Sequence, residues 1–213
     1  MTKTLTRLFD DYADATAALQ DLERLGVPHD SISIVASNAD GAHGDGTTTL
    51  GEVDDRGDVS RGVSTGAAVG GVGGLLAGLG LLAIPGLGPI VAAGWLASTV
   101  VGAGIGAAGG AATGTIVGAL KDAGHSDDEA HVYSEGVRRG GTLLSARVDD
   151  ALAVDAEAVL DRNRSVDATT RGNAYRQQGW SQFDEAAPAY TRDEVADERN
   201  RYRPTATPSS TNY

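Results

Sequence analysis

The sequence of 213 residues contains no cysteine, which excludes disulfide bonds and thiolate chemistry. Positive charge is also scarce, because Lys3 and Lys121 are the only lysines and the formal net charge is −12. This acidic balance argues against a nucleic-acid partner and against simple electrostatic adsorption to anionic lipid. The first residues contain no apolar run, so we expect no signal peptide and a cytoplasmic start.

Charge is absent from one long stretch, between Arg61 and Lys121, where a small residue recurs every four positions. Residues four apart lie on one face of a helix. Two prolines and two glycines within residues 84–89 divide the stretch into two arms. The pattern predicts a glycine-zipper helical hairpin over residues 62–120. The predicted packing residues are Gly62, Gly66, Gly70, Gly74, Gly78, Gly94, Ser98, Gly102, Gly106, Gly110, Gly114 and Gly118.

The setting of this hairpin is left open by its composition. Close packing of small residues is typical of membrane helices, and the first arm as a helix would be about 33 Å long, enough to span a bilayer. Large apolar residues crowd the tip, from Leu75 to Leu96, while the bases hold Gly, Ala, Ser and Thr. That gradient suits insertion into a membrane tip first, and it also suits a soluble oligomer that buries its tips. A flexible linker is the bland alternative, but it needs no four-residue register.

The flanking segments predict an α+β domain split by the hairpin. Residues 4–9 form a strand, a helix begins at Asp11 in a capping box with Asp14 and ends at Gly26, and residues 32–36 form a second strand. The apolar stripe of the helix is expected at Ala15, Ala18, Leu19 and Leu22.

Beyond the hairpin a second half follows the same plan. A capping box at Ser126 opens a helix that ends near Gly140, residues 143–148 form a strand, another helix starts at Asp149, and residues 166–168 form a short edge strand. Two βαβ halves, in residues 1–37 and 121–170, predict one four-stranded antiparallel sheet backed by helices, a split ferredoxin-like layer.

Two polar segments complete the chain. Residues 38–61 are rich in Gly, Asp and Thr, and they are predicted to be a flexible linker. Residues 171–213 are polar and are predicted to be mostly disordered, with a short helix capped at Thr191. Trp180, Phe183 and Tyr190 in this tail form a candidate docking motif for a protein partner. The alternative is that the rings pack on the chain's own domain. Docking and self-packing would both bury the rings, so the sequence does not distinguish them.

Candidate chemistry is weak throughout. Gly104, Gly106 and Gly109 match the G-x-G-x-x-G spacing of dinucleotide sites, but the four-residue glycine register runs through them without interruption. A metal site at His125, Asp127, Asp128 and His131 lacks a further ligand set, and the aspartates already suit a helix N-terminus. We therefore predict no catalytic, cofactor or metal residue.

Several segments resemble one bacterial family. They are Leu8-Phe9-Asp10-Asp11, AALQDL at residues 17–22, GVP at 26–28, ISIVA at 32–36 and EAHVYSEGVRRGGTL at 129–143. In these segments the chain resembles the general stress protein family whose domain is called YflT-like, or heat-induced stress protein. The resemblance covers about residues 4–37 and 121–168, and bacterial members with the same Gly-rich insertion extend it to the hairpin. It implies a non-enzymatic protein induced by heat, osmotic or related stress, and it brings no catalytic residues.

These observations lead to one expected function and one alternative. We expect a non-enzymatic stress-response protein on the cytoplasmic face of the inner membrane, homo-oligomeric and structural or protective in role. The alternative is a soluble oligomeric scaffold in the cytoplasm, which recruits a partner through its aromatic tail.

Overall fold

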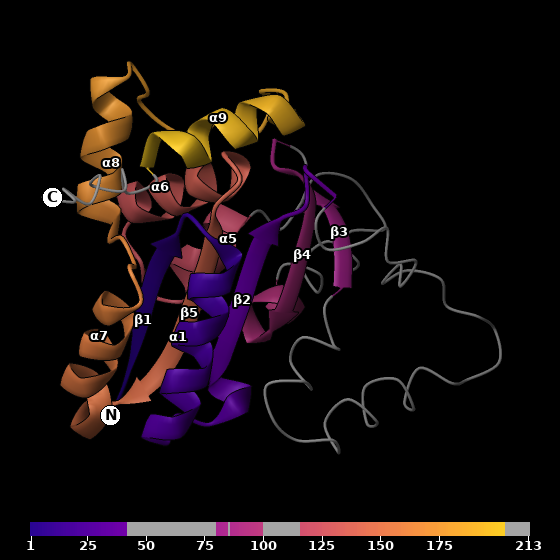
Figure 1. Ribbon diagram of the computed structural model, residues 1–213. Coiled ribbons are helices and arrows are strands. Elements are labelled where there is room, and N and C mark those ends of the chain that lie inside the picture. The colour runs from indigo at the N-terminus through magenta and orange to yellow at the C-terminus, as the bar shows by residue number, and fades with distance from the viewer. Residues whose placement is uncertain (42–79, 85, 100–115, 203–213) are drawn as a thin grey trace, which may run out of the picture.

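The computed structural model describes residues 1–41, 80–84, 86–99 and 116–202, and it is a mixed α+β fold built on one antiparallel sheet (Figure 1). The strands lie in the order β1-β5-β2-β4-β3, and every neighbouring pair is antiparallel. Their bounds are β1 Thr2–Phe9, β2 Ile32–Ser37, β3 Gly80–Ile84, β4 Gly88–Gly94 and β5 Thr142–Asp149. Strand β5 comes late in the chain, yet it lies between the two strands of the N-terminal half.

One face of the sheet carries α1 (Tyr12–Leu25) and α7 (Ala153–Arg162). In Figure 1, α1 lies in front of the sheet and α7 lies beside the start of β1. Helix α1 begins where the Asp11 carboxylate accepts a hydrogen bond from the Ala13 backbone N–H at 2.9 Å. It ends at Gly26, whose φ of +103° suits glycine. Asp14, expected to complete a capping box, instead forms an ion pair with Arg164.

The core on this face confirms the predicted stripe of α1. Ala15, Ala18, Leu19 and Leu22 are fully buried there, together with Ile32 and Ile34 of β2, as the strand pattern predicted. From α7 the core receives Ala156, Val159 and Leu160. The start of α7 differs slightly from expectation, because a 3₁₀ turn (Asp150–Leu152) precedes it.

The opposite face carries α5 (Ile116–Asp122) and α6 (Asp127–Arg138), with α8 (Ala168–Gln177) packed against α6. The capping box of α6 is confirmed: Glu129 N–H donates to Ser126 Oγ at 3.3 Å, and Ser126 N–H donates to the Glu129 carboxylate at 2.9 Å. The predicted buried side of α6 is confirmed as well, at Ala130, Tyr133 and Val137.

The helical hairpin predicted for residues 62–120 is wrong over residues 80–94. There the chain forms a β-hairpin, in which β3 pairs with β4 and β4 continues the sheet beside β2. Gly86 and Gly88 take φ values of +76° and +78°, and the Ile84 carbonyl accepts a hydrogen bond from Leu87 N–H at 3.1 Å, so the break is a tight strand turn. Ile90 and Val91 are β-branched residues that suit a strand.

The apolar residues assigned to a membrane-inserting tip are therefore partly used inside the protein. Leu87, Ile90, Val91 and Leu96 are each less than 5% exposed. In the described parts of the chain, no helix is both long enough and apolar enough to cross a membrane.

Of the predicted zipper residues, the structure describes Gly94, Ser98 and Gly118. Gly94 ends β4 with a φ of +89°, and a Cβ there would overlap the backbone of Ile32, so it serves a close strand contact rather than a helix face. Ser98 is exposed in a helical turn after β4, and Gly118 is half-buried in α5. The other predicted zipper residues lie outside the described residues: Gly62, Gly66, Gly70, Gly74, Gly78, Gly102, Gly106, Gly110 and Gly114. The same holds for the Gly104, Gly106 and Gly109 motif.

The predicted disordered tail is wrong over residues 171–202. Most of α8 lies there, and α9 (Arg192–Tyr202) crosses one end of the sheet at the top of Figure 1. The short helix predicted from Thr191 is confirmed as α9, because Thr191 and Glu194 form its reciprocal cap. Residues 203–213 lie outside the described part, as do residues 42–61 of the predicted linker.

The predicted edge strand at residues 166–168 is reduced to one bridge. Val166 and Leu8 exchange backbone hydrogen bonds of 2.9 and 2.7 Å on the outer side of β1. Ala168 already belongs to α8. At this bridge the chain passes the β1 edge of the sheet, from the face that carries α7 to the face where α8 packs against α6.

Candidate functional site

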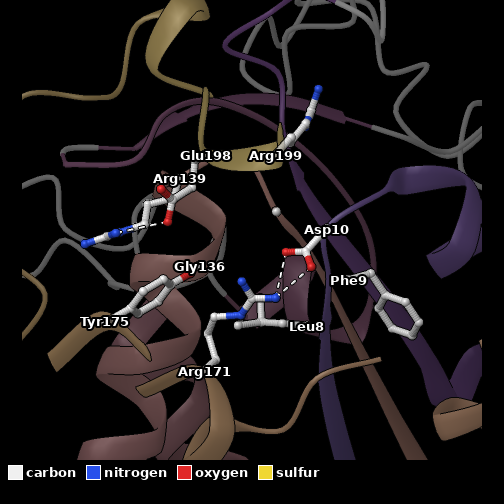
Figure 2. Close-up of a pocket in the computed structure, with 10 residues that line it drawn as sticks. Leu8, Phe9, Asp10, Gly136, Arg139, Arg171, Tyr175, Glu198 and Arg199 are labelled. Carbon is white, nitrogen blue, oxygen red and sulfur yellow. Dashed lines mark hydrogen bonds and ion pairs between the residues drawn. The ribbon is translucent and has the colours of Figure 1, made fainter. Parts of the chain in front are cut away.

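A cluster of buried and partly buried charges lies where the C-terminal helices meet the end of the sheet. It comprises five arginines and four carboxylates, which we call the charge cluster: Arg138, Arg139, Arg171, Arg199, Arg201, Asp10, Asp40, Glu135 and Glu198. Its members come from α6 and its C-terminal cap, from α8 and α9, from the end of β1 and from the segment after β2. Figure 2 shows Asp10, Arg139, Arg171, Glu198 and Arg199 of this cluster. The cluster therefore carries one net positive charge within a chain whose net charge is −12.

Glu135 is the centre of the cluster on α6. Its side chain is 0% exposed, and it accepts hydrogen bonds from Arg139 Nε at 2.6 Å and from Arg138 Nη2 at 2.8 Å. One turn of helix separates the carboxylate from both guanidinium groups, so residues three and four positions apart meet on one face. Burial alone would lower the pKa of Arg139, but the hydrogen bond and charge of Glu135 outweigh it and raise that pKa.

Arg139 also joins α6 to the C-terminal helices. Its Nη1 donates to Glu198 of α9 at 3.0 Å and to Gln178 at 2.9 Å. The guanidinium carbon lies 4.1 Å from the ring centroid of Tyr175 in α8, a cation–π contact. Figure 2 shows Arg139 directed toward Glu198, with Tyr175 close by.

Arg171 of α8 forms the second link of the cluster. Its Nη2 donates to both carboxylate oxygens of Asp10, at 2.7 and 2.8 Å, and its side chain is 3% exposed. The guanidinium carbon lies 3.9 Å from the ring centroid of Tyr202 in α9. Asp10 directly follows β1, so this contact ties both C-terminal helices to the first strand.

Arg199 of α9 completes the arrangement. It donates to the Gly140 carbonyl at 3.0 Å and pairs with Asp40. Gly140 has a φ of +97°, and Val195 of α9 packs so closely against it that an added Cβ would overlap the valine. Helix α9 is thus held mainly by polar contacts, since Val195 and Glu198 are its buried residues.

A cavity of about 10 Å³ lies inside the cluster, which is room for a single water molecule. Asp10, Arg139, Arg171, Tyr175 and Glu198 line it. Each carboxylate of the cluster accepts from at least one guanidinium, and arginine stays protonated at physiological pH. The chemistry available here is charge pairing that holds segments together.

The predicted docking motif lies beside this cluster, and it packs on the chain's own domain. Phe183 is 4% exposed within the same apolar core as α6, and Trp180 is partly buried against that core. The ring centroid of Tyr190 lies 5.4 Å from the guanidinium carbon of Arg138. Phe183 therefore packs on the chain's own domain, as the alternative predicted, whereas Trp180 and Tyr190 are half-buried and their role in docking stays a prediction.

The histidines considered for a metal site have other partners. His125 Nε2 lies 2.7 Å from Thr6 Oγ1, and burial lowers its pKa. His131 Nε2 lies 3.5 Å from Asp127. Across the described ranges, no group of three or more His, Cys, Asp or Glu residues is placed to hold a metal ion.

Sequence reasoning missed the charge cluster. A signal was present on α6, where Glu135 precedes Arg138 and Arg139 by three and four positions. Such a spacing usually indicates an exposed ion pair, because isolated charges on a helix face water. The partners Asp10 and Glu198 have no sequence signal, since they are brought together only by the fold.

The comparisons with known proteins add no relative to this description. No protein-family model matches the chain, and no similar curated protein or solved structure was found.

Proposed function

We propose that this chain is a non-enzymatic bacterial general stress-response protein with a structural or protective role. The proposal starts from the family resemblance of residues 4–37 and 121–168. The observation that carries it is the meeting of two resembling segments, 8–11 and 129–143, around one cavity. Phe9 and Asp10 come from the first segment, and Gly136, Arg139 and Gly141 come from the second. The resemblance therefore concerns a single packed unit rather than two unrelated stretches.

The non-enzymatic part of the proposal is supported by the state of the acidic groups in the cluster. Asp10, Asp40, Glu135 and Glu198 are all engaged by arginines. A general base needs a carboxylate or imidazole that can reach a substrate proton. Carboxylates committed to buried ion pairs serve packing better than proton transfer.

We also infer a split ferredoxin-like layout for the domain core. Strands β1 and β2 flank β5, which is the arrangement of a split βαβ unit with α1 as its connection. The bridge of Val166 on the outer side of β1 stands where the last strand of the second unit belongs. The β3–β4 hairpin is then an addition at the β2 edge.

Association with the cytoplasmic face of the inner membrane is part of the proposal, and we assign it to the glycine-rich arms within residues 62–79 and 100–115. Residues 80–94 no longer take part, because they belong to the sheet. We further propose that the protein is a homo-oligomer with no nucleic-acid partner, in keeping with its net charge of −12. A soluble oligomeric scaffold is the competing outcome, without recruitment through the buried Phe183.

The test is survival of a deletion strain of the source bacterium under heat and under osmotic upshift. We expect survival to fall in the deletion strain and to recover when the full chain is supplied on a plasmid, whereas the empty plasmid gives no recovery. Equal survival of deletion and parent strains under both stresses would overturn the stress role.

Fractionation of the same cultures tests the location. Protein that stays in a carbonate-washed membrane pellet supports membrane association. Protein that leaves the pellet as a discrete large particle supports the soluble scaffold instead.

A further inference from the structure

The two edges of the sheet are built differently. Strand β1 forms one edge, and it carries Lys3 and Arg7, which pair with Glu157 and Asp161 of α7. Val166 forms its bridge to Leu8 on the outer side of this strand. Charged residues and partial cover are the usual devices that stop one sheet edge from pairing with another.

Strand β3 forms the other edge of the described sheet, and its own sequence carries no charged residue. Its sequence is Gly-Leu-Leu-Ala-Ile, with no charge and no proline. In the part of the chain that the structure describes, β3 pairs with β4 alone. An uncharged apolar edge strand is a template for another strand.

The outward-facing backbone groups of β3 follow from the neighbouring strands. In an antiparallel strand, the N–H and C=O of one residue point to the same side, and the side alternates along the chain. The Pro89 carbonyl accepts from Asn38 N–H at 2.8 Å, so Pro89 faces β2 and Ile90 faces β3. Ile90 is paired with Leu82, which therefore faces β4.

Leu81 and Ala83 consequently direct their N–H and C=O groups to the side of β3 that faces away from β4. Two donors and two acceptors stand there in alternation. A second β3 turned by a two-fold rotation about Leu82 presents the same set, so that Leu81 of one copy faces Ala83 of the other. This pairing satisfies all four groups of each strand in an isologous contact.

We propose that β3 pairs edge to edge with β3 of a second copy of this chain and joins two five-stranded sheets into one. A second copy is the favoured occupant because the strand is self-complementary in this register and carries no charge. An unrelated acidic or basic strand would gain no charge complementarity there. The inference rests on the oligomeric part of the proposed function, and it specifies the contact.

The test uses the full-length chain and two variants at one position. Ala83→Pro removes an outward N–H and blocks the edge with its ring, and it removes no hydrogen bond to β4 because Ala83 faces away from that strand. Ala83→Ser keeps the N–H and is the matched control. We expect self-association, measured by sedimentation across protein concentrations, to weaken at least tenfold in Ala83→Pro and to stay unchanged in Ala83→Ser.

Amide hydrogen exchange in the unaltered chain gives a second readout that needs no variant. We expect the amides of Leu81 and Ala83 to become protected as concentration rises, while the amide of Leu82 is protected at all concentrations. Protection of Leu81 and Ala83 that does not depend on concentration would mean that the chain covers its own edge, and it would overturn the proposal.

Two further results would also overturn it. One is an oligomer that persists equally in Ala83→Pro and Ala83→Ser, which leaves the oligomeric function standing and places the contact elsewhere. The other is a wild-type chain that stays monomeric at every concentration, which removes the oligomer as well. The stress-survival test does not depend on either result.

Discussion

Replacing the central carboxylate of the charge cluster, Glu135→Gln, tests whether the buried charges hold the domain together. The substitution keeps the shape of the side chain and removes its charge, so Arg138 and Arg139 lose a partner that is 0% exposed. Breaking a buried pair in this way costs about 3–5 kcal/mol, because a charge is left without compensation. Arg139 keeps Glu198 at 3.0 Å, which favours the lower end, about 3 kcal/mol.

A loss of this size is readily measured. Domains have free energies of unfolding of about 5–15 kcal/mol, and about 3 kcal/mol lowers Tm by roughly 6–12 °C in a chain of this size. The assay is urea unfolding at 25 °C, followed by far-UV circular dichroism and by the fluorescence of the two tryptophans, Trp95 and Trp180.

The matched control is Glu157→Gln, the same chemical change in an exposed ion pair. Glu157 accepts from Lys3 at 2.7 Å, but the two side chains are 37% and 53% exposed. Such pairs contribute about 0–1 kcal/mol. If the two variants lost the same free energy of unfolding, within about 0.5 kcal/mol, the cluster would not be a stabilising centre and the reasoning would fail.

Three further substitutions probe other contacts. Gly140→Ala should lower the free energy of unfolding by about 1–2 kcal/mol from its φ of +97° alone. Because the new Cβ overlaps Val195, amide hydrogen exchange in α9 should become faster while that of the sheet stays the same. Burial raises the pKa of Tyr133 to about 12, so its contribution to the stability of the folded state is complete below pH 10 and is lost as pH rises toward 12. The thermal stability of Tyr133→Phe should therefore depend less on pH in that window than the stability of the unaltered chain. The backbone hydrogen bond from Ser126 lowers the pKa of Glu129, so the contribution of this carboxylate to the stability of the folded state is lost as pH falls through the lowered value. The stability of Glu129→Gln should therefore change less in acid than that of the unaltered chain. The same acid dependence in both proteins would contradict the capping role.

The parts of the fold that local chemistry determines could be predicted. Asp11 and Gly26 bound α1, and Ser126 with Glu129 opens α6, because each cap is a contact within four residues of the chain. The cap at Thr191 identified α9 for the same reason. Local signals of this kind do not depend on how distant segments pack.

The prediction of a helical hairpin was wrong at residues 80–94 because the sequence pattern there is ambiguous. Residues four apart share a helix face, but they also share the face of a strand, where side chains alternate with a period of two. The break with Gly86 and Gly88 suits a strand turn as well as a helix turn. The β-branched residues Ile84, Ile90 and Val91 favour strands, but the prediction treated them only as apolar residues of a helical tip.

The C-terminal segment shows a different limit of sequence reasoning. Its composition is polar, and a polar segment buries too little apolar surface to order itself. In this protein the segment is held by both kinds of contact: Tyr175 and Phe183 enter the apolar core, while Arg171 pairs with Asp10 and Arg139 with Glu198. The buried residues of α9 are Val195 and Glu198, so this helix has little apolar contact. Its position therefore depends on the arginine–carboxylate pairs more than the position of the sheet does. The same arginines stack on Tyr175 and Tyr202, which explains why a polar segment is rich in aromatic residues: the rings cover the guanidinium groups that hold the segment in place.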